Sequence, residues 1–302
     1  MLTKLSQLLA QGRFVSPVPA VVVQPTTDII LQSCIQAHQH HIITPILVGP
    51  KHKIEKAATD ANLDISGFTL VDAEHSHDAV EIAAKMVREQ QADFIIKGSV
   101  HTDELMGVLI DKTQNLRTER RMSHVWLMES PTYHKLLTLT DCALNAVPDL
   151  LTKKDILQNA IDFATTLDLE QPKVALFAAV EEVKPQMQST SDAAALCKMA
   201  DRGQITGALL DGPLAFDNAI SQQSADIKHI HSPVTGDVDI LLVPDLEAGN
   251  MLGKQLIYLG EAKAAGIVMG SKVPIVLTSR SDDELDRLYS IALGAYVAQK
   301  RK

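Results

Sequence analysis

Residues 272–298 read KVPIVLTSRSDDELDRLYSIALGAYVA, and this stretch predicts a strand, a tight turn and a helix. The apolar, β-branched run at 273–277 is typical of a strand buried in a parallel sheet. Ser281 and Glu284 have the S-x-x-E spacing of a capping box, which predicts a helix that starts at Asp282. Apolar residues then recur at helical spacing and predict one core-facing stripe: Leu285, Leu288, Tyr289, Ala292 and Tyr296.

The turn within this stretch holds the residues that suggest chemistry. Ser279 and Arg280 lie between the strand and the helix, where open α/β sheets place their ligands. The free N–H groups and partial positive charge of a helix N-terminus, together with the Arg280 side chain, favour an anion site. The alternative is an ordinary connecting turn with an exposed arginine, since Asp282 and Asp283 weaken the local positive field. The turn alone leaves both interpretations open.

Composition limits the class of protein. A chain of 302 residues usually divides into two domains, and 46% hydrophobic with 22% charged residues is typical of a soluble globular protein. No window approaches the roughly 20 apolar residues of a membrane span. Residues 1–14 lack the apolar core and cleavage site of a signal peptide. We therefore expect a cytoplasmic protein that has no membrane partner.

Charge and cysteine content exclude further classes. The net charge of −9 argues against nucleic acid as the main partner but allows an anionic small molecule in a locally basic cleft. Cys34, Cys142 and Cys197 have no paired spacing, which argues against a disulfide framework or a zinc site. The histidines within 38–41 and 75–77 border surface turns without carboxylates at ligand spacing, so we expect no metal site. The common glycine-rich nucleotide-binding fingerprints are absent from the sequence.

The first part of the chain alternates strand and helix signals. Expected strands at 20–23, 45–48, 68–71 and 94–97 are each followed by a helical pattern. Strands separated by helices of about 10–15 residues are the signature of βαβ units and a parallel sheet. After residue 120 two neighbouring strands precede a second α/β series, which ends in an expected long helix over 248–265.

This change of pattern predicts two α/β domains. We expect residues 1–119 and 271–302 to form the first domain and residues 120–270 to form the second, because the stretch at 272–298 returns the chain to the first sheet. Such a crossing leaves a cleft between domains, where small-molecule sites tend to lie.

Three more strand ends resemble the turn at 278–281. Each carries candidate substrate-binding residues: Lys97, Gly98, His101 and Thr102; then Asp211, Gly212 and Pro213 in an expected turn; then Asp245, Glu247, Gly249 and Asn250 before a helix. Each alone is a weak signal, because D-G-P and A-G-N are common turn sequences. Four such turns on two sheets favour a common site, and we expect the turns to meet in the cleft between the domains.

The order of several motifs resembles one known family. The motifs are KGSVHTDEL (97–105), LTDCALNAVPDL (139–150), LLDGPLAFDNA (209–219), VPDLEAGN (243–250) and TSR (278–280). Together they are similar to the phosphate acetyltransferase and phosphate butyryltransferase family over essentially the whole chain, and most similar to its domains that follow an enoyl-CoA hydratase domain. The resemblance implies a homodimer whose chain has two three-layer α/β/α domains with mostly parallel sheets around an interdomain cleft, as in isocitrate and isopropylmalate dehydrogenases.

The same resemblance implies the reaction and the residues that perform it. The family reversibly transfers a short acyl group, of the acetyl or butyryl class, between coenzyme A and inorganic phosphate, giving acyl phosphate without a metal or redox cofactor. The family's S-R turn falls on Ser279 and Arg280, which would hydrogen-bond the reacting groups and stabilise charge on phosphate and thioester oxygens. An aspartate seven residues after the serine, here Asp286, would deprotonate the thiol of coenzyme A; its alternative role is to stabilise the helix dipole.

Two positions depart from the family pattern. Family arginines fall on Gly107 and Tyr258, so cationic contacts to phosphate or coenzyme A are missing or come from other residues, such as Lys97 or the arginines of LRTERR (116–121). This departure supports an alternative, a non-catalytic subunit of the same fold that binds acyl-CoA or acyl phosphate. A metal- and NAD-dependent decarboxylating dehydrogenase of related fold is a third hypothesis, which the absence of a clustered aspartate metal motif opposes.

Overall fold

The computed structural model describes residues 2–10, 12–278 and 282–301, and the chain forms two compact units. We call Leu5–Arg120 with Ala265–Lys302 the terminal unit, and Arg121–Ala264 with Met1–Lys4 the inserted unit. The chain passes between them after Lys4, Arg120 and Ala264. The sequence predicted boundaries after residues 119 and 270 and none after Lys4. That the units are separately folding domains stays a prediction.

The terminal unit is built on a mostly parallel set of strands in the order β3-β2-β1-β4-β11-β10. These are β1 (Val18–Val23), β2 (Ile43–Gly49), β3 (Thr69–Asp72), β4 (Phe94–Lys97), β10 (Lys263–Met269) and β11 (Ile275–Val276). Only the pairing of β10 with β11 is antiparallel among the pairings given for these six strands. Every residue of β4 is buried, as the near-continuous apolar sequence of a parallel strand predicts.

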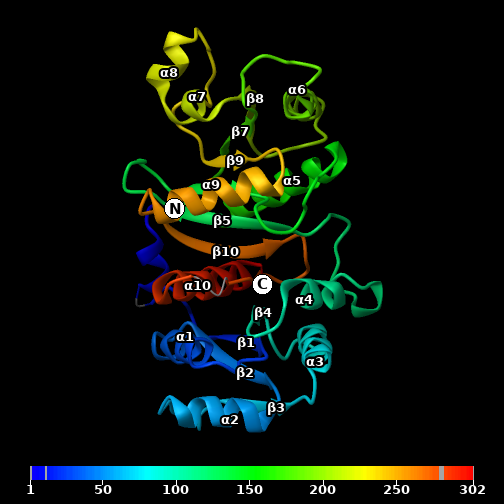
Figure 1. Cartoon of the computed structure of the whole chain (residues 1–302), viewed down its shortest axis with the longest axis vertical. Coiled ribbons are helices and arrows are strands. Elements are labelled where there is room, and N and C mark those ends of the chain that lie inside the picture. Colours follow the sequence, from blue (N-terminus) through cyan, green and yellow to red (C-terminus); the bar gives the residue numbers. More distant parts are fainter. Residues whose placement is uncertain (1, 11, 279–281, 302) are drawn as a thin grey trace. The chain divides into compact units, whose positions relative to one another are not determined.

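The helices of the terminal unit follow its strands. They are α1 (Asp28–Gln39), α2 (Lys51–Asp60), α3 (Ser76–Arg88), α4 (Thr102–Leu109) and α10 (Glu284–Lys300), with short 3-10 turns η1 (Leu5–Leu9) and η2 (Lys112–Gln114). Figure 1 shows α10 in red beside α1, and α10 also packs on η1, β1, β4 and β11. Residues 288–298 are therefore buried without a break, and the predicted single apolar stripe was wrong.

The inserted unit has the strand order β5-β6-β9-β7-β8. Its strands are β5 (Ser123–Glu129), β6 (Leu137–Thr140), β7 (Lys173–Phe177), β8 (Leu209–Leu214) and β9 (Ile240–Leu242), and its helices are α5 (Leu150–Thr166), α6 (Gln188–Asp201), α7 (Phe216–Ile220), α8 (Gln222–Ile227) and α9 (Leu246–Tyr258). β5 and β6 are antiparallel, and β6, β9, β7 and β8 run parallel. The carboxyl ends of these four strands therefore meet at one edge.

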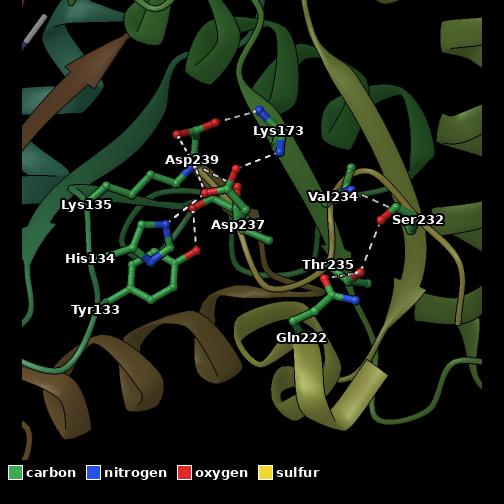
Figure 2. A network of polar contacts seen from close by, with 11 residues as sticks. Tyr133, His134, Lys135, Lys173, Gln222, Ser232, Val234, Thr235, Asp237 and Asp239 are labelled. Atoms are coloured by element: carbon green, nitrogen blue, oxygen red, sulfur yellow. Dashed lines mark hydrogen bonds and ion pairs between the residues drawn. The ribbon is translucent and has the colours of Figure 1, made fainter. Parts of the chain in front are cut away.

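Charged side chains gather at the opposite edge, where β7 and β9 begin (Figure 2). Lys173 Nζ donates to Asp237 at 2.6 Å, and His134 Nε2 lies 2.8 Å from the same carboxylate. Lys135 Nζ lies 2.9 Å from Asp237 and 2.8 Å from Asp239. The network ties three chain segments together at the start of the strands.

One predicted helix is partly a strand. The sequence predicts a helix over 248–265, but α9 ends at Tyr258 and β10 begins at Lys263. Glu261 adopts a left-handed φ of 53°, which a continuing helix does not allow. The alanines of 262–265 favour a helix locally, yet burial of the β-branched end of β10 in the sheet decides the outcome. No helix within the described ranges is both long and apolar enough to cross a membrane.

Candidate active site

The start of α10 differs from its prediction. Ser279, Arg280 and Ser281 lie outside the described residues, so the expected S-R turn and serine cap are not described. The helix begins at Glu284 rather than Asp282, and Asp283 is its N-cap. The Asp283 carboxylate accepts a hydrogen bond from the main-chain N–H of Asp286 at 2.7 Å. Aspartate caps a helix as well as serine does, and its charge complements the helix dipole.

Asp286 lies in the first turn of α10 and is 7% exposed. This turn is tied to the sheet through Ser290, whose hydroxyl donates to the Asp286 carbonyl at 2.8 Å and accepts from the Gly266 N–H at 3.0 Å. The carboxylate therefore stands on a helix that is anchored to β10. Such anchoring is what a positioned base needs.

β4 and β11 end together within the terminal unit. The two strands are parallel with Val276 opposite Ile96, so Leu277 and Lys97 leave the sheet at the same edge. Lys97 is 9% exposed. Gly98 follows it, and a Cβ there would lie 2.3 Å from the Val23 carbonyl oxygen. The glycine that we predicted to allow close backbone approach does so toward the end of β1.

His101 and Thr102 open α4 just beyond this edge. His101 occupies the N-cap position, is exposed and makes no side-chain cap hydrogen bond, and Thr102 is half-buried. The terminal unit thus brings a buried lysine and a histidine to the end of β4, and a buried carboxylate to the helix after β11. A lysine and N–H donors at a strand end can hold an anion, and a fixed carboxylate can accept a proton.

The D-G-P sequence of the inserted unit is not a turn, contrary to its prediction. Asp211, Gly212 and Pro213 all lie within β8, and the Gly212–Pro213 peptide bond is cis. Asp211 accepts a hydrogen bond from the N–H of Gly212 at 2.8 Å. A Cβ at Gly212 would lie 2.6 Å from the Leu176 Cβ, so close packing on β7 requires glycine. Pairing with β7 overrides the local turn signal.

The A-G-N sequence lies inside α9, which begins at Leu246 and not at the predicted residue 248, and two residues of this stretch have structural roles. Asp245 is the N-cap, and its carboxylate accepts from the Ala248 N–H at 2.8 Å. A Cβ at Gly249 would lie 2.7 Å from Val243 Cγ2, so this glycine is required by packing. Glu247 is exposed. Asn250 is half-buried and donates through Nδ2 to the Cys142 carbonyl at 3.3 Å.

One residue at this edge was not among the predicted site residues. Asp141 directly follows β6, is 3% exposed and accepts hydrogen bonds from the main chain of residues 143–145. The sequence signal is an aspartate at the end of a buried strand, four residues before Asn145, which is typical of a side chain that folds the following turn.

The thiols and metal-binding groups do not suggest other chemistry. Burial, and then the charge of Asp141, raises the pKa of Cys142 well above its usual range. Burial raises the pKa of Cys197 to about 11. Both side chains are therefore protonated at neutral pH, which fits their predicted packing role better than nucleophilic catalysis. Within residues 2–10, 12–278 and 282–301, no three His, Cys, Asp or Glu side chains are placed to hold a metal ion.

Comparisons with known proteins agree with these motifs. The family model described as Phosphate acetyl/butaryl transferase matches residues 73–295. A phosphate acetyltransferase from Rhizobium meliloti is 49% identical over 99% of this chain and 95% of its own length. A phosphate butyryltransferase from Clostridium beijerinckii is 38% identical over 98% of each chain. The crystal structure of a branched-chain phosphotransacylase from Enterococcus faecalis superposes with a TM-score of 0.82 at 30% identity, covering 93% of this chain and 99% of that one. The chain belongs to the phosphate acetyl/butaryl transferase family.

Proposed function

We propose that this protein is a phosphate acyltransferase. It reversibly transfers a short-chain acyl group, of the acetyl or butyryl class, between coenzyme A and inorganic phosphate, giving acyl phosphate. The observation that carries the proposal is membership of the family over residues 73–295, with near full-length relatives named for both activities.

The proposed mechanism is direct transfer in a ternary complex. The thiolate of coenzyme A attacks the carbonyl carbon of the acyl phosphate, so that a C–S bond forms, the C–O bond breaks and phosphate leaves. Asp286 takes the thiol proton; a free thiol has a pKa of about 8.5, so a fixed base raises the thiolate fraction at neutral pH. Ser279 and Arg280 hold the phosphoryl and thioester oxygens. In the reverse direction phosphate attacks the thioester.

The remaining predicted residues divide by what their contacts support. Lys97, His101 and Thr102, at the end of β4, are proposed to contact the anionic parts of the substrates. Glu247 and Asn250 are proposed to contact substrate at the start of α9. The other six are proposed to shape the same strand ends. Gly98, Gly212 and Gly249 do so through close packing and Asp245 as a helix cap, while Asp211 and Pro213 flank Gly212 within β8.

We also propose the setting of the reaction. Coenzyme A and phosphate enter as substrates, no metal or redox cofactor takes part, and the enzyme acts in the cytoplasm as a homodimer without a nucleic-acid or membrane partner. Support for the dimer comes from the outer side of α9 and its end, where Met251, Tyr258 and Leu259 are 64%, 62% and 80% exposed. Large apolar side chains exposed together are typical of protein interfaces.

The test is phosphate-dependent release of free thiol from acyl-CoA substrates of increasing chain length, from acetyl to hexanoyl. Release that requires phosphate is the expected result, and the chain length with the highest kcat/KM identifies the substrate. Release without phosphate would indicate a hydrolase instead.

A non-catalytic acyl-CoA-binding subunit is the second candidate, and two positions favour it. Gly107 and Tyr258 replace family arginines; a Cβ at Gly107 meets nothing within 4 Å, and Tyr258 is exposed. Coenzyme A binding without turnover of any substrate in the series would support this candidate. Gly107→Arg, for which there is room, would then be expected to bring some turnover back.

A further inference from the structure

We propose that Asp141 is a positioning residue for acyl transfer. Its carboxylate folds the loop 141–146, and this loop fixes both the start of α9 and the segment that enters β5. The inference rests on the proposed function, because it takes the start of α9 as a substrate-contacting element.

Asp141 is saturated with hydrogen bonds. Its Oδ1 accepts from the main-chain N–H groups of Ala143 at 3.0 Å and Leu144 at 3.1 Å. Its Oδ2 accepts from Asn145, through the main-chain N–H at 3.2 Å and the side-chain Nδ2 at 2.6 Å. The main-chain N–H of His124 also donates to this carboxylate. A buried carboxylate with these partners acts through the loop that it holds, not by touching substrate.

The loop contacts α9 at its first turn. The N–H of Leu246 donates to the Ala146 carbonyl at 3.2 Å, and Asn250 Nδ2 donates to the Cys142 carbonyl at 3.3 Å. A Cβ at Gly249 would lie 2.9 Å from Cys142 Sγ and 3.1 Å from the Asp141 carbonyl oxygen. The helix start therefore lies directly against the loop, and a shift of the loop moves Asn250.

The same loop holds the segment that enters β5. Asn145 Nδ2, which donates to Asp141, also donates to the Met122 carbonyl at 3.0 Å. Arg121 precedes Met122; its N–H donates to Asp155 at 3.0 Å and its carbonyl accepts from Asn159 at 2.8 Å. The main chain on both sides of the exposed Arg121 is thus fixed by side chains of the inserted unit. Asp141 orients Asn145, which is one of these supports.

Replacement of Asp141 by asparagine tests the role without creating a cavity. Both carboxylate oxygens accept from two donors of residues 143–145, so an amide NH2 on either side meets two N–H donors. Burial raises the pKa of Asp141, although the hydrogen bonds from Ala143 and Asn145 act in the opposite direction. The variant keeps the size of the side chain but replaces one of the two acceptor oxygens that fold the loop with an NH2 donor.

Asp239→Asn is the matched control. Asp239 is also buried, at 6% exposed, and accepts the N–H of Lys173 at 2.8 Å, but it lies at the amino end of β9. We expect both variants to lose thermal stability. Only Asp141→Asn should raise the KM for phosphate or acyl-CoA, by about tenfold, with kcat within about threefold of the unchanged protein.

Other outcomes decide against the proposal. An unchanged KM in folded Asp141→Asn, or an equal rise of KM in Asp239→Asn, would show that Asp141 only stabilises the fold. If Asp141→Asn does not unfold cooperatively, Asn145→Ala replaces it, because this variant removes one donor to Asp141 and the bond to Met122; the same KM rise is expected, and its absence overturns the proposal.

Failure of the proposed function is distinguishable from failure of this inference. If the unchanged protein turns over no acyl-CoA, the proposed function fails, and the Kd of coenzyme A measured by calorimetry replaces KM. A Kd about tenfold weaker in Asp141→Asn but not in Asp239→Asn then supports the positioning role. An equal Kd in both variants, or no binding by the unchanged protein, overturns it.

Discussion

Two glycines of the terminal unit have opposite surroundings. A Cβ at Gly98 would lie 2.3 Å from the Val23 carbonyl oxygen, whereas a Cβ at Gly107, inside α4, meets nothing within 4 Å. We expect Gly98→Ala to lower the free energy of unfolding by about 1–3 kcal/mol, because the ends of β1 and β4 must separate. Gly107→Ala should raise it by about 0.5–1 kcal/mol, through the preference of helices for alanine. Urea denaturation of both variants is the measurement, and a stable Gly98→Ala would contradict the close approach.

Asp286 separates a catalytic from a structural explanation. If Asp286 is the base, Asp286→Asn should lower kcat by about 10²–10⁴-fold. It should also remove the rise of the rate with pH on the acid side, since only the ionised carboxylate accepts the thiol proton. Asp283→Asn is the control, because asparagine caps a helix as well as aspartate. It should leave kcat and thermal stability nearly unchanged. A loss of stability in Asp286→Asn with normal kcat would assign Asp286 to the helix dipole instead.

Local sequence patterns predicted those helices and strands whose tertiary contacts agree with their local preferences. The βαβ series of the first 110 residues follows from strand and helix periodicity, and the structure confirms it from β1 to α4. The prediction of a turn at D-G-P was wrong because the pairing of β8 with β7, which only the folded sheet supplies, outweighs the turn propensity of these residues. The start of β10 was predicted as helix because its alanines favour a helix locally, and burial in the sheet outweighs this preference. Tertiary context decided each error.

The network at the start of β7 and β9 predicts a pH dependence of stability. Burial alone would raise the pKa of Asp237, but hydrogen bonds from Lys173, His134 and Lys135 outweigh it and hold this pKa well below its usual range (Figure 2). A carboxylate with a depressed pKa stabilises the folded state above its unfolded pKa of about 3.9, and the stabilisation is lost as pH falls toward the folded value. Because Asp237 is 42% exposed, solvent reduces the size of the effect.

Asp237→Asn removes this contribution. We expect the variant to unfold at a lower urea concentration than the unchanged protein at pH 7, and the difference to shrink as pH falls below about 4. Urea titrations from pH 2 to pH 7 measure it. A difference that stays constant over this range would show that the hydrogen bonds, rather than the charge, account for the stabilisation.

In the candidate site, the sequence predicts which residues lie at a strand end better than it predicts the contacts that those residues make. The strand and helix pattern of the sequence predicted Lys97 at the end of a strand and Asn250 near the start of a helix, and the structure has them at the end of β4 and in the first turns of α9. The roles of Asp245 and Gly249, a cap and a packing position, depend on atoms of Ala248 and Val243 that the motif does not reveal. Asp141 was missed for a similar reason, because three of its donors are main-chain N–H groups and only Asn145 contributes a side chain.

The division of the chain into two units leads to a prediction about folding. A cluster of buried apolar residues forms the core of the inserted unit. Its members lie between Met128 and Ala264 in the sequence and include Leu139, Leu241 and Val243. This core draws on β5 to β9 and the start of β10, and all of it lies between residues 121 and 264. A segment of this size with its own core usually folds alone. We therefore expect residues 121–264, expressed separately, to unfold cooperatively.

Leu241→Ala makes this prediction quantitative. Leu241 is 0% exposed within the core of the inserted unit, so its truncation should cost about 2–5 kcal/mol. If the unit folds independently, the loss should be the same in the separate segment and in the corresponding transition of the full chain, because the cavity has the same neighbours in both. A segment without a cooperative transition would show that the inserted unit needs the terminal unit to fold, and the domain division would then describe contacts but not folding units.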